Sequence, residues 1–494
     1  MDLIIINGSI LTMDEANPRA EAVAIREGKF AAAGTNEEIL ALRSGHTTLI
    51  DAGGKSVLPG FNDSHLHLVG YALSKNRVDI SNLDSIEALQ DRLRSHIRRL
   101  APAKGSWIIG RGWDQTPYPN QRMPDRHDLD RVSTAYPMMM TRKCGHVCVL
   151  NTAGLKASAL FDHPPLVEGG LIELDADGRP TGILKENAMD LVNIPSQSMS
   201  RDAVKALILS AAQDFVKAGL TSVQTDDLGA FAGAPPDLFN AYLELAAQGE
   251  LPLRVNEQML LAQPDELKQI IGLGWVTGRG NDYFKIGPLK LLTDGSFGGR
   301  SALLCEPYTD DPDNRGIALL TREQLKELTI MAHQAGMQVA AHAIGDQAIK
   351  DMLDIYKEAQ DEYPRDDARF RIIHASLTPP ALLDRFKEQG VLADVQPCFI
   401  SSDLPFIKSR LGKARASDAY CFKGFLRRGI PMGGGSDCPV EDYRPLMGIH
   451  AAVNRQGDDG QPQEGWLPQQ KLTLHEALYL YTMGSAYNSI EEDI

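Results

Sequence analysis

From residue 57 onward, short apolar runs alternate with longer segments in which apolar residues recur three and four positions apart. Runs of about four to eight apolar residues that end in polar ones are typical of buried strands, and the longer pattern is typical of amphipathic helices. A repeated strand–helix alternation predicts a parallel sheet, and at this length an α/β fold of the (β/α)8 TIM-like barrel type. The strands are predicted at 57–61, 107–110, 137–141, 221–225, 253–258, 284–292, 338–341, 370–373, 392–396 and 430–434. The clearest helices are predicted at 201–218, 322–335 and 380–389.

These runs outnumber the eight strands of one barrel, so some of them belong to an inserted segment. We place the insertion after the first barrel strand, at about 72–193, because the runs there are widely spaced and separated by many turns. The barrel domain with its insertion then covers 57–485.

The first 56 residues predict a small β domain, a β-sandwich built mainly from these N-terminal strands. Residues 3–6 form a β-rich run, Asn7-Gly8 is a strong hairpin signal, and 9–13 is the expected return strand. A second hairpin is expected at 22–26 and 29–33, with a further strand at 47–51.

Composition and charge limit the kinds of binding partner that the sequence predicts. The chain has 494 residues, of which 43% are hydrophobic and 23% charged, as in an ordinary soluble domain. A net charge of −15 would repel a phosphate backbone, so no nucleic-acid partner is expected. The N-terminus lacks a basic signal region, and no apolar stretch reaches the roughly 18 residues of a membrane span. The six cysteines lack dense spacing, and together these features predict a cytoplasmic protein without a membrane partner.

Four histidines follow or end strand-like runs. In a strand, residues two apart point to the same side, so His65 and His67 can present both rings to one ion. His342 and His374 each end a separate apolar run. Singly, each fits a half-buried histidine with satisfied hydrogen bonds. Because strand ends converge in a barrel, the four together predict a metal centre.

Asp437 follows the glycine-rich run 433–435. A carboxylate beside a metal can hold the ion, accept a proton from its bound water, or do both in turn. The alternative is an N-cap of the following helix.

At this point the motifs resemble a known family. They are similar to the amidohydrolase superfamily, in particular its YtcJ-like branch, also called amidohydrolase family 3, which includes N-substituted formamide deformylase. That superfamily has an HxH after the first barrel strand, single histidines after the fifth and sixth, and an aspartate after the eighth. The resemblance spans nearly the whole chain. The matching pieces occur in the family's order at 58–67 (LPGFNDSHLH), 182–186 (GILKE), 290–296 (KLLTDGS), 341–346 (AHAIGD), 371–375 (RIIHA) and 435–440 (GSDCPV).

The resemblance implies a set of metal ligands. They are His65, His67, Glu186, His342, His374 and Asp437. Asp437 would also be the general base. Glu186 resembles the carboxylate that bridges two ions, and its neighbour Lys185 is an alternative as a carbamylated bridge, a device used elsewhere in the superfamily. We favour Glu186 because it is anionic without modification, although both fit a solvated charge pair as well.

Further positions are expected to face the substrate. By the resemblance, His146 lies where the branch carries a histidine directed at substrate, and we expect it to be catalytic. Trp113 and Asp114 are expected to line the entrance. Asp294 and Arg300 flank the glycine-rich loop 295–299, where Arg300 could hold a substrate carbonyl or carboxylate or form a structural salt bridge.

The expected function is metal-dependent hydrolysis of a non-peptide C–N bond in a small molecule, such as a linear or cyclic amide or an N-acyl or N-formyl amine. One or two divalent ions are expected, zinc in the first place. The alternatives are deaminase, esterase or decarboxylase chemistry, or a non-catalytic regulatory or binding protein with the same barrel. The resemblance also leaves a homodimer open. Relatives continue past 489–492 with strands that complete the small domain, so 486–494 is predicted as a shortened return to it, with the C-terminal strands missing.

Overall fold

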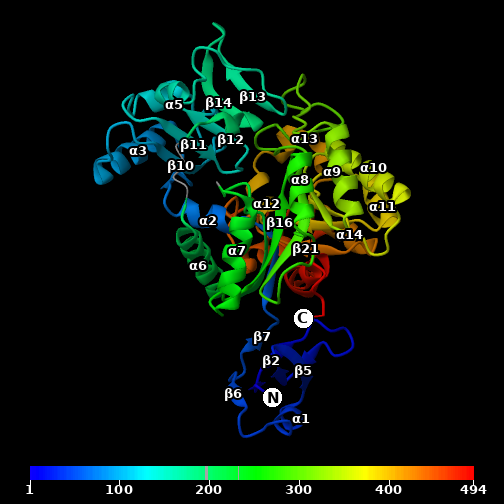
Figure 1. The fold of residues 1–494 in the computed structure, drawn as a ribbon. Coiled ribbons are helices and arrows are strands. Elements are labelled where there is room, and N and C mark those ends of the chain that lie inside the picture. Colours follow the sequence, from blue (N-terminus) through cyan, green and yellow to red (C-terminus); the bar gives the residue numbers. More distant parts are fainter. Residues whose placement is uncertain (195–198, 232, 494) are drawn as a thin grey trace.

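The computed structural model describes residues 1–194, 199–231 and 233–493, and its centre is an eight-stranded parallel sheet curled into a barrel (Figure 1). The strands lie in chain order around it: β8 (Phe61–Leu66), β15 (Leu220–Thr225), β16 (Arg254–Leu260), β17 (Phe284–Leu292), β18 (Val339–Ala343), β19 (Arg371–His374), β20 (Leu392–Val395) and β21 (Met432–Gly434). Backbone hydrogen bonds join the two ends of the sheet just beyond β8 and β21, from Asp437 N–H to the His65 carbonyl (2.8 Å) and from His67 N–H to the Cys438 carbonyl (2.7 Å). The predicted barrel is confirmed.

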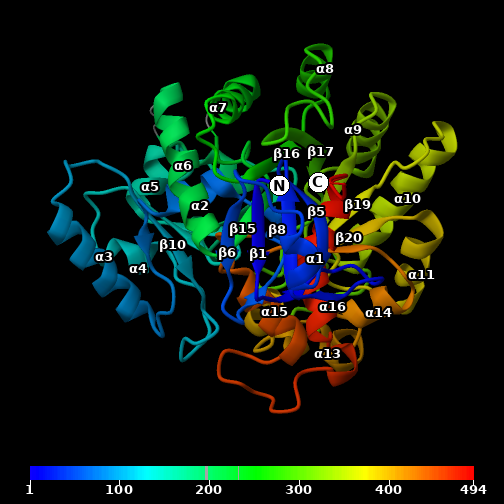
Figure 2. The same cartoon turned by 90° about the horizontal axis from the view of Figure 1, so that it is seen from below.

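Helices cover the outside of the barrel, and seen from below α6 to α11 form an arc around its strands (Figure 2). They are α6 (Arg201–Lys217), α7 (Pro235–Ala247), α8 (Pro264–Gly272), α9 (Arg322–Gln334), α10 (Asp346–Glu362) and α11 (Pro380–Gln389). Sequence signals define several helix ends; Thr321 and Gln324, for example, form a reciprocal capping box at the start of α9. No helix in the described part of the chain has the length and apolarity needed to cross a bilayer.

The first barrel strand differs from its prediction. The strand begins at Phe61 rather than ending there, and Val57 belongs to a short strand of the N-terminal domain, β7 (Ser56–Val57). Pro59 has no backbone N–H to donate, and a Cβ at Gly60 would collide with the Thr221 side chain. All six residues of β8 are buried, although most of them are polar. Inside the barrel, Asp63 accepts a hydrogen bond from the His65 N–H and Asn62 accepts one from the Gln224 amide. A hydrophobic pattern therefore misses this strand.

A six-stranded sheet lies between β8 and β15 in the chain, where the sequence predicts the insertion. Its strand order is β13 (Gly170–Leu174), β14 (Pro180–Glu186), β12 (Val147–Leu150), β11 (Met138–Arg142), β10 (Ile108–Trp113) and β9 (Val78–Asp79). Together with α3 (Ile86–Leu100) it has its own hydrophobic core. Figure 1 shows this insertion above the barrel and the N-terminal strands below it.

The N-terminal strands form two small sheets. One has the order β5 (Lys29–Gly34), β4 (Ala22–Arg26), β1 (Leu3–Ile6) and β6 (Thr48–Asp51), and the other β3 (Arg19–Ala20), β2 (Ser9–Leu11) and β7. The hairpin predicted at Asn7-Gly8 is wrong, because β1 and β2 belong to different sheets. Asn7 N–H donates to the Asn36 side chain and Gly8 N–H to the Glu21 carbonyl, so the chain crosses between the sheets here. The β4–β5 hairpin is confirmed.

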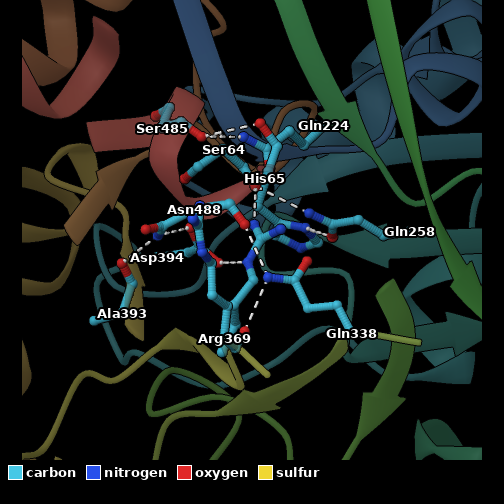
Figure 3. A network of polar contacts seen from close by, with 12 residues as sticks. Ser64, His65, Gln224, Gln258, Gln338, Arg369, Ala393, Asp394, Ser485 and Asn488 are labelled. Atoms are coloured by element: carbon cyan, nitrogen blue, oxygen red, sulfur yellow. Dashed lines mark hydrogen bonds and ion pairs between the residues drawn. The ribbon is translucent and has the colours of Figure 1, made fainter. Parts of the chain in front are cut away.

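The C-terminal helices α16 (Leu474–Tyr479) and α17 (Ser485–Asn488) anchor the end of the chain to the barrel. Figure 3 shows the network of polar contacts between α17 and the barrel strands. The Asn488 amide donates to Asp394 Oδ1 (2.8 Å), and Arg371, itself buried, donates to Asp394 Oδ2 (2.7 Å) and to the Ser64 carbonyl (3.1 Å). The C-terminal helix is thereby tied to the residue before His65.

Candidate metal centre and substrate pocket

Five imidazole rings lie in series at the carboxyl ends of the barrel strands. Neighbouring ring centroids are separated by 5.1 Å from His67 to His65, 5.7 Å from His65 to His374, 4.4 Å from His374 to His342 and 5.2 Å from His342 to His146. The barrel supplies four of the rings, and the insertion supplies His146. The structure therefore brings together all four predicted metal-binding histidines and the predicted catalytic histidine.

Asp437 lies against the first two rings. Its Oδ1 atom is 3.1 Å from His67 Nε2 and 3.4 Å from His65 Nε2, and these three ligand atoms all fall within 4.8 Å of one another. Burial by itself would raise the pKa of Asp437, but its contacts with His65 and His67 hold it well below its usual range. An ionised carboxylate and two imidazole nitrogens around one point are a suitable donor set for a divalent ion.

Two buried glutamines orient two of these rings. The Gln258 Oε1 atom is 2.7 Å from His65 Nδ1 while its amide donates to the Ser64 carbonyl, at 3.0 Å (Figure 3). Gln396 Oε1 is likewise 2.7 Å from His374 Nδ1. Because each glutamine presents an acceptor, each ring carries its proton on Nδ1 and leaves the Nε2 lone pair for an ion.

The other two rings follow the same rule with backbone acceptors. His67 Nδ1 is 2.9 Å from the Asp226 carbonyl, and His342 Nε2 is 3.1 Å from the Gly295 carbonyl. Burial lowers the pKa of His342 and lowers that of His374 to about 3, so these rings are neutral. Neutral imidazoles with one nitrogen engaged by the protein are the form in which histidine binds metal, so the residues present fit a divalent ion.

The Gln258→Leu substitution is expected to weaken zinc binding by about 10- to 100-fold, because it removes the acceptor that holds the His65 tautomer. Competition with a chromophoric chelator measures this affinity. Gln258→Glu, which keeps an acceptor at the same position, should retain more of it. The exposed Gln334→Leu is the matched control. An unchanged affinity in a folded Gln258→Leu protein would show that the glutamine only fills space.

Glu186 contacts the histidine series at its far end. Its Oε2 atom is 2.7 Å from His146 Nδ1, and its buried Oε1 atom has no hydrogen-bond partner among the described residues. A Cβ at Gly295 would collide with this carboxylate. Burial would lower the pKa of His146, but the charge of Glu186 and the hydrogen bond to it raise it to about 9. His146 is therefore an imidazolium held by a carboxylate.

Lys185, the alternative bridge, lies apart from the histidines. Successive residues of a strand face opposite sides, so Lys185 and Glu186 take different faces of β14. Burial lowers the pKa of Lys185, and the charges that act on it most strongly are those of Glu173 and Arg300. The geometry gives it no contact with the predicted centre.

Lys290, on β17, is a residue that the sequence reasoning missed. It is 1% exposed, and its Nζ atom lies 3.2 Å from His65 Nε2. Burial lowers the pKa of this amine. The available signal was a lysine inside the apolar run 284–292, where only an inward contact with polar groups explains a charged residue.

A pocket opens above the histidines, and two predicted substrate residues line it. His146 and Asp114 belong to its wall together with His342, His374 and Asp437. Asp114 is 2.9 Å from the guanidinium of Arg142, which also lies on the wall.

Three other predicted substrate residues are not among the described residues that line this pocket. Trp113 is fully buried in the insertion, and its indole N–H donates to the Met140 carbonyl (2.8 Å). Asp294 accepts hydrogen bonds from backbone N–H groups, including that of Gly345 (2.8 Å), and so organises the loop ends. Arg300 pairs with Asp310 at 3.1 Å, which corresponds to the structural alternative for this residue.

Comparison with known proteins agrees with this geometry. The model of a family described as "Amidohydrolase family" matches residues 48–494. The chain belongs to the amidohydrolase family. This amidohydrolase is 34% identical over 480 residues to YtcJ of Bacillus subtilis (strain 168), a protein whose name describes it as an amidohydrolase. The match covers 97% of this chain and 88% of that protein.

Two further relatives are informative. N-substituted formamide deformylase of Arthrobacter pascens is 27% identical to this amidohydrolase over 504 residues, covering 99% of this chain and 89% of that enzyme. The crystal structure of an uncharacterized metal-dependent hydrolase from Pyrococcus horikoshii OT3 superposes with a TM-score of 0.78 at 32% identity. That superposition covers 100% of this chain and 94% of the other. The family resemblance read from the sequence is confirmed.

Proposed function

We propose that this protein is a metal-dependent hydrolase that cleaves a non-peptide C–N bond in a small molecule, as in a linear or cyclic amide or an N-acyl or N-formyl amine. The observation that carries the proposal is the convergence of His65, His67, His342, His374 and Asp437, with one ring nitrogen of each histidine engaged by a protein acceptor outside this set. Family membership supports a hydrolase. Similarity to a formamide deformylase supports an amide-like substrate.

The proposed cofactor is one or two divalent ions, zinc in the first place. His65, His67 and Asp437 would hold one ion, and His342 and His374 the other. Lys290 would bridge them, because its Nζ atom lies 3.2 Å from His65 Nε2 and its charge also acts on His342 and His374. Its buried amine, once neutral, can add to CO2 and lose a proton, which gives a carbamate with two oxygen donors. Glu186, the bridge expected from the resemblance, contacts His146 and is retained here as the competing proposal.

The chain's own groups then have separate tasks. A bound divalent ion supplies Lewis acidity that activates water and polarises a carbonyl oxygen. Asp437 accepts a proton from the attacking water and passes it to the leaving nitrogen. His146, kept protonated by Glu186, donates a hydrogen bond to the developing oxyanion.

The test is the metal content of the purified protein by plasma mass spectrometry, followed by turnover of N-formyl and N-acyl amines. Esters and aminated heterocycles in the same panel represent the esterase and deaminase alternatives. The expected result is about one or two zinc ions per chain, as in one- and two-metal hydrolases, and hydrolysis of amides before esters. A protein that stays free of metal after zinc is supplied would overturn the proposal and favour the non-catalytic binding protein. The cytoplasmic location and the homodimer remain predictions.

A further inference from the structure

One wall of the pocket is the short helix α12 (Cys398–Asp403), which follows β20 at the carboxyl end of the barrel. The Phe399 ring lies parallel to that of His374, with centroids 5.7 Å apart and an interplanar angle of 15°. Asp403 is four residues further on, so it shares a face of the helix with Phe399, about 6 Å along the axis. Both side chains line the pocket. Asp403 is thus one helical turn along α12 from Phe399, whose ring stacks on a predicted metal-binding histidine.

The other charged groups on this wall already have partners. They are Arg142 with Asp114 at 2.9 Å, Lys143 with Glu441 at 2.8 Å, and His146 with Glu186 at 2.7 Å. Asp403, in contrast, forms no ion pair within 4.0 Å among the described residues, although the charges of Arg142 and Lys143 act on it from further away. This part of the wall therefore holds three carboxylates, those of Asp114, Glu441 and Asp403, against the two cations Arg142 and Lys143.

The remaining contact of Asp403 orients it. The buried hydroxyl of Tyr420 donates to Asp403 Oδ2 at 2.5 Å, which leaves Oδ1 for another donor. Phe399 and Phe406 contribute aromatic surface to the same part of the wall. Burial raises the pKa of Asp403 to about 7, although the hydrogen bond from Tyr420 and the charges of Arg142 and Lys143 act in the opposite direction.

We propose that Asp403, oriented by Tyr420, is a subsite for a cationic nitrogen of the substrate. A carboxylate next to aromatic faces is the surrounding that an ammonium group prefers. An anionic substituent is disfavoured, because Arg142 and Lys143 are both committed to carboxylates. The substrate class is then an amide that also carries an ammonium group. This substrate class rests on the proposed amide hydrolysis, whereas cation binding at Asp403 does not.

The turnover test compares two amides that differ only in charge. N-acetyl-1,4-diaminobutane and N-pentylacetamide have chains of equal length, with an ammonium group in the first replaced by a methyl group in the second. The wild type should prefer the charged amide by about 10- to 100-fold in kcat/KM, the size expected for a charge-assisted hydrogen bond. In Asp403→Asn the ratio of the two kcat/KM values should fall to about one. Asp384→Asn, a surface carboxylate paired with Arg428, is the matched control.

A binding measurement separates this inference from the proposed function. Calorimetry with the metal-free protein should detect N-acetyl-1,4-diaminobutane but not N-pentylacetamide, and Asp403→Asn should lose this binding. Tyr420→Phe, which keeps the carboxylate but not its hydroxyl partner, should weaken it. Selective binding without turnover of any amide would refute the hydrolase and leave the subsite standing. Turnover or binding of both amides with equal efficiency by the wild type would overturn the subsite.

Discussion

Asp437→Asn is expected to lower kcat on an amide substrate by about 100- to 10,000-fold, because the amide cannot accept the proton of the attacking water. The side chain keeps its size, and the backbone N–H of residue 437 still donates to the His65 carbonyl, so the loop after β21 should hold its place. KM should change little, since Asp437 acts on the water rather than on the remote part of the substrate. Steady-state kinetics on the amide identified in the substrate panel measure both constants.

The zinc content of Asp437→Asn determines whether its loss of kcat reports on proton transfer or on loss of the metal. Asp437 is also a proposed ligand, and a variant that has lost its zinc would be inactive for that reason alone. The kinetics are therefore measured at saturating zinc, with bound metal quantified in the same sample. A zinc-loaded Asp437→Asn protein with normal kcat would remove Asp437 from the role of general base. Asp384→Asn serves again as the charge-matched surface control.

Lys290→Ala is expected to lower the zinc content by about one ion per chain and to abolish most of the activity. The buried amine lies 3.2 Å from His65 Nε2, in the position from which a carbamate could reach ions on both sides. Lys185→Ala is the matched control, because it removes a lysine from β14 that does not contact the histidines. Plasma mass spectrometry measures the zinc content per chain of both variants and of Glu186→Gln.

The three variants separate the two candidate bridges. Loss of zinc in Lys290→Ala with normal zinc in Glu186→Gln would assign the bridge to Lys290 and leave Glu186 as the partner of His146. The reverse pattern would return the bridge to Glu186, as the resemblance implies. Normal zinc in both would mean that neither residue bridges two ions.

Much of the barrel could be predicted from the chain because its strands carry their own signal. The run 284–292 was placed with the bounds of β17, since its residues are buried and mostly apolar. The first strand was not placed correctly, because Asn62, Asp63 and Ser64 are polar and still buried. The burial of Asn62 and Asp63 depends on hydrogen bonds to the rest of the barrel, such as those from Ser436 N–H to Asp63, and no local pattern reveals these partners.

In the candidate site, too, some residues could be placed from the sequence and others could not. His65, His67, His342 and His374 each follow or end a strand, and parallel strands must bring their carboxyl ends together. Trp113 and Arg300 had only a position near a motif as support. In the structure, Trp113 packs in the core of the insertion and Arg300 forms an ion pair with Asp310, because packing and charge pairing determine where such side chains point.

The sequence by itself determined the (β/α)8 barrel, the family and the histidines at the strand ends, because periodicity and motif order are local properties of the chain. Only the tertiary structure decided which nitrogen of each histidine a protein acceptor engages, that Lys290 contacts His65, and that Tyr420 donates to Asp403. The first two depend on partners far away in the chain: Gln258 is 193 residues from His65, and Lys290 is 225 residues from it. Contacts between such distant residues form only when the barrel closes, and the order of residues along the chain does not reveal them.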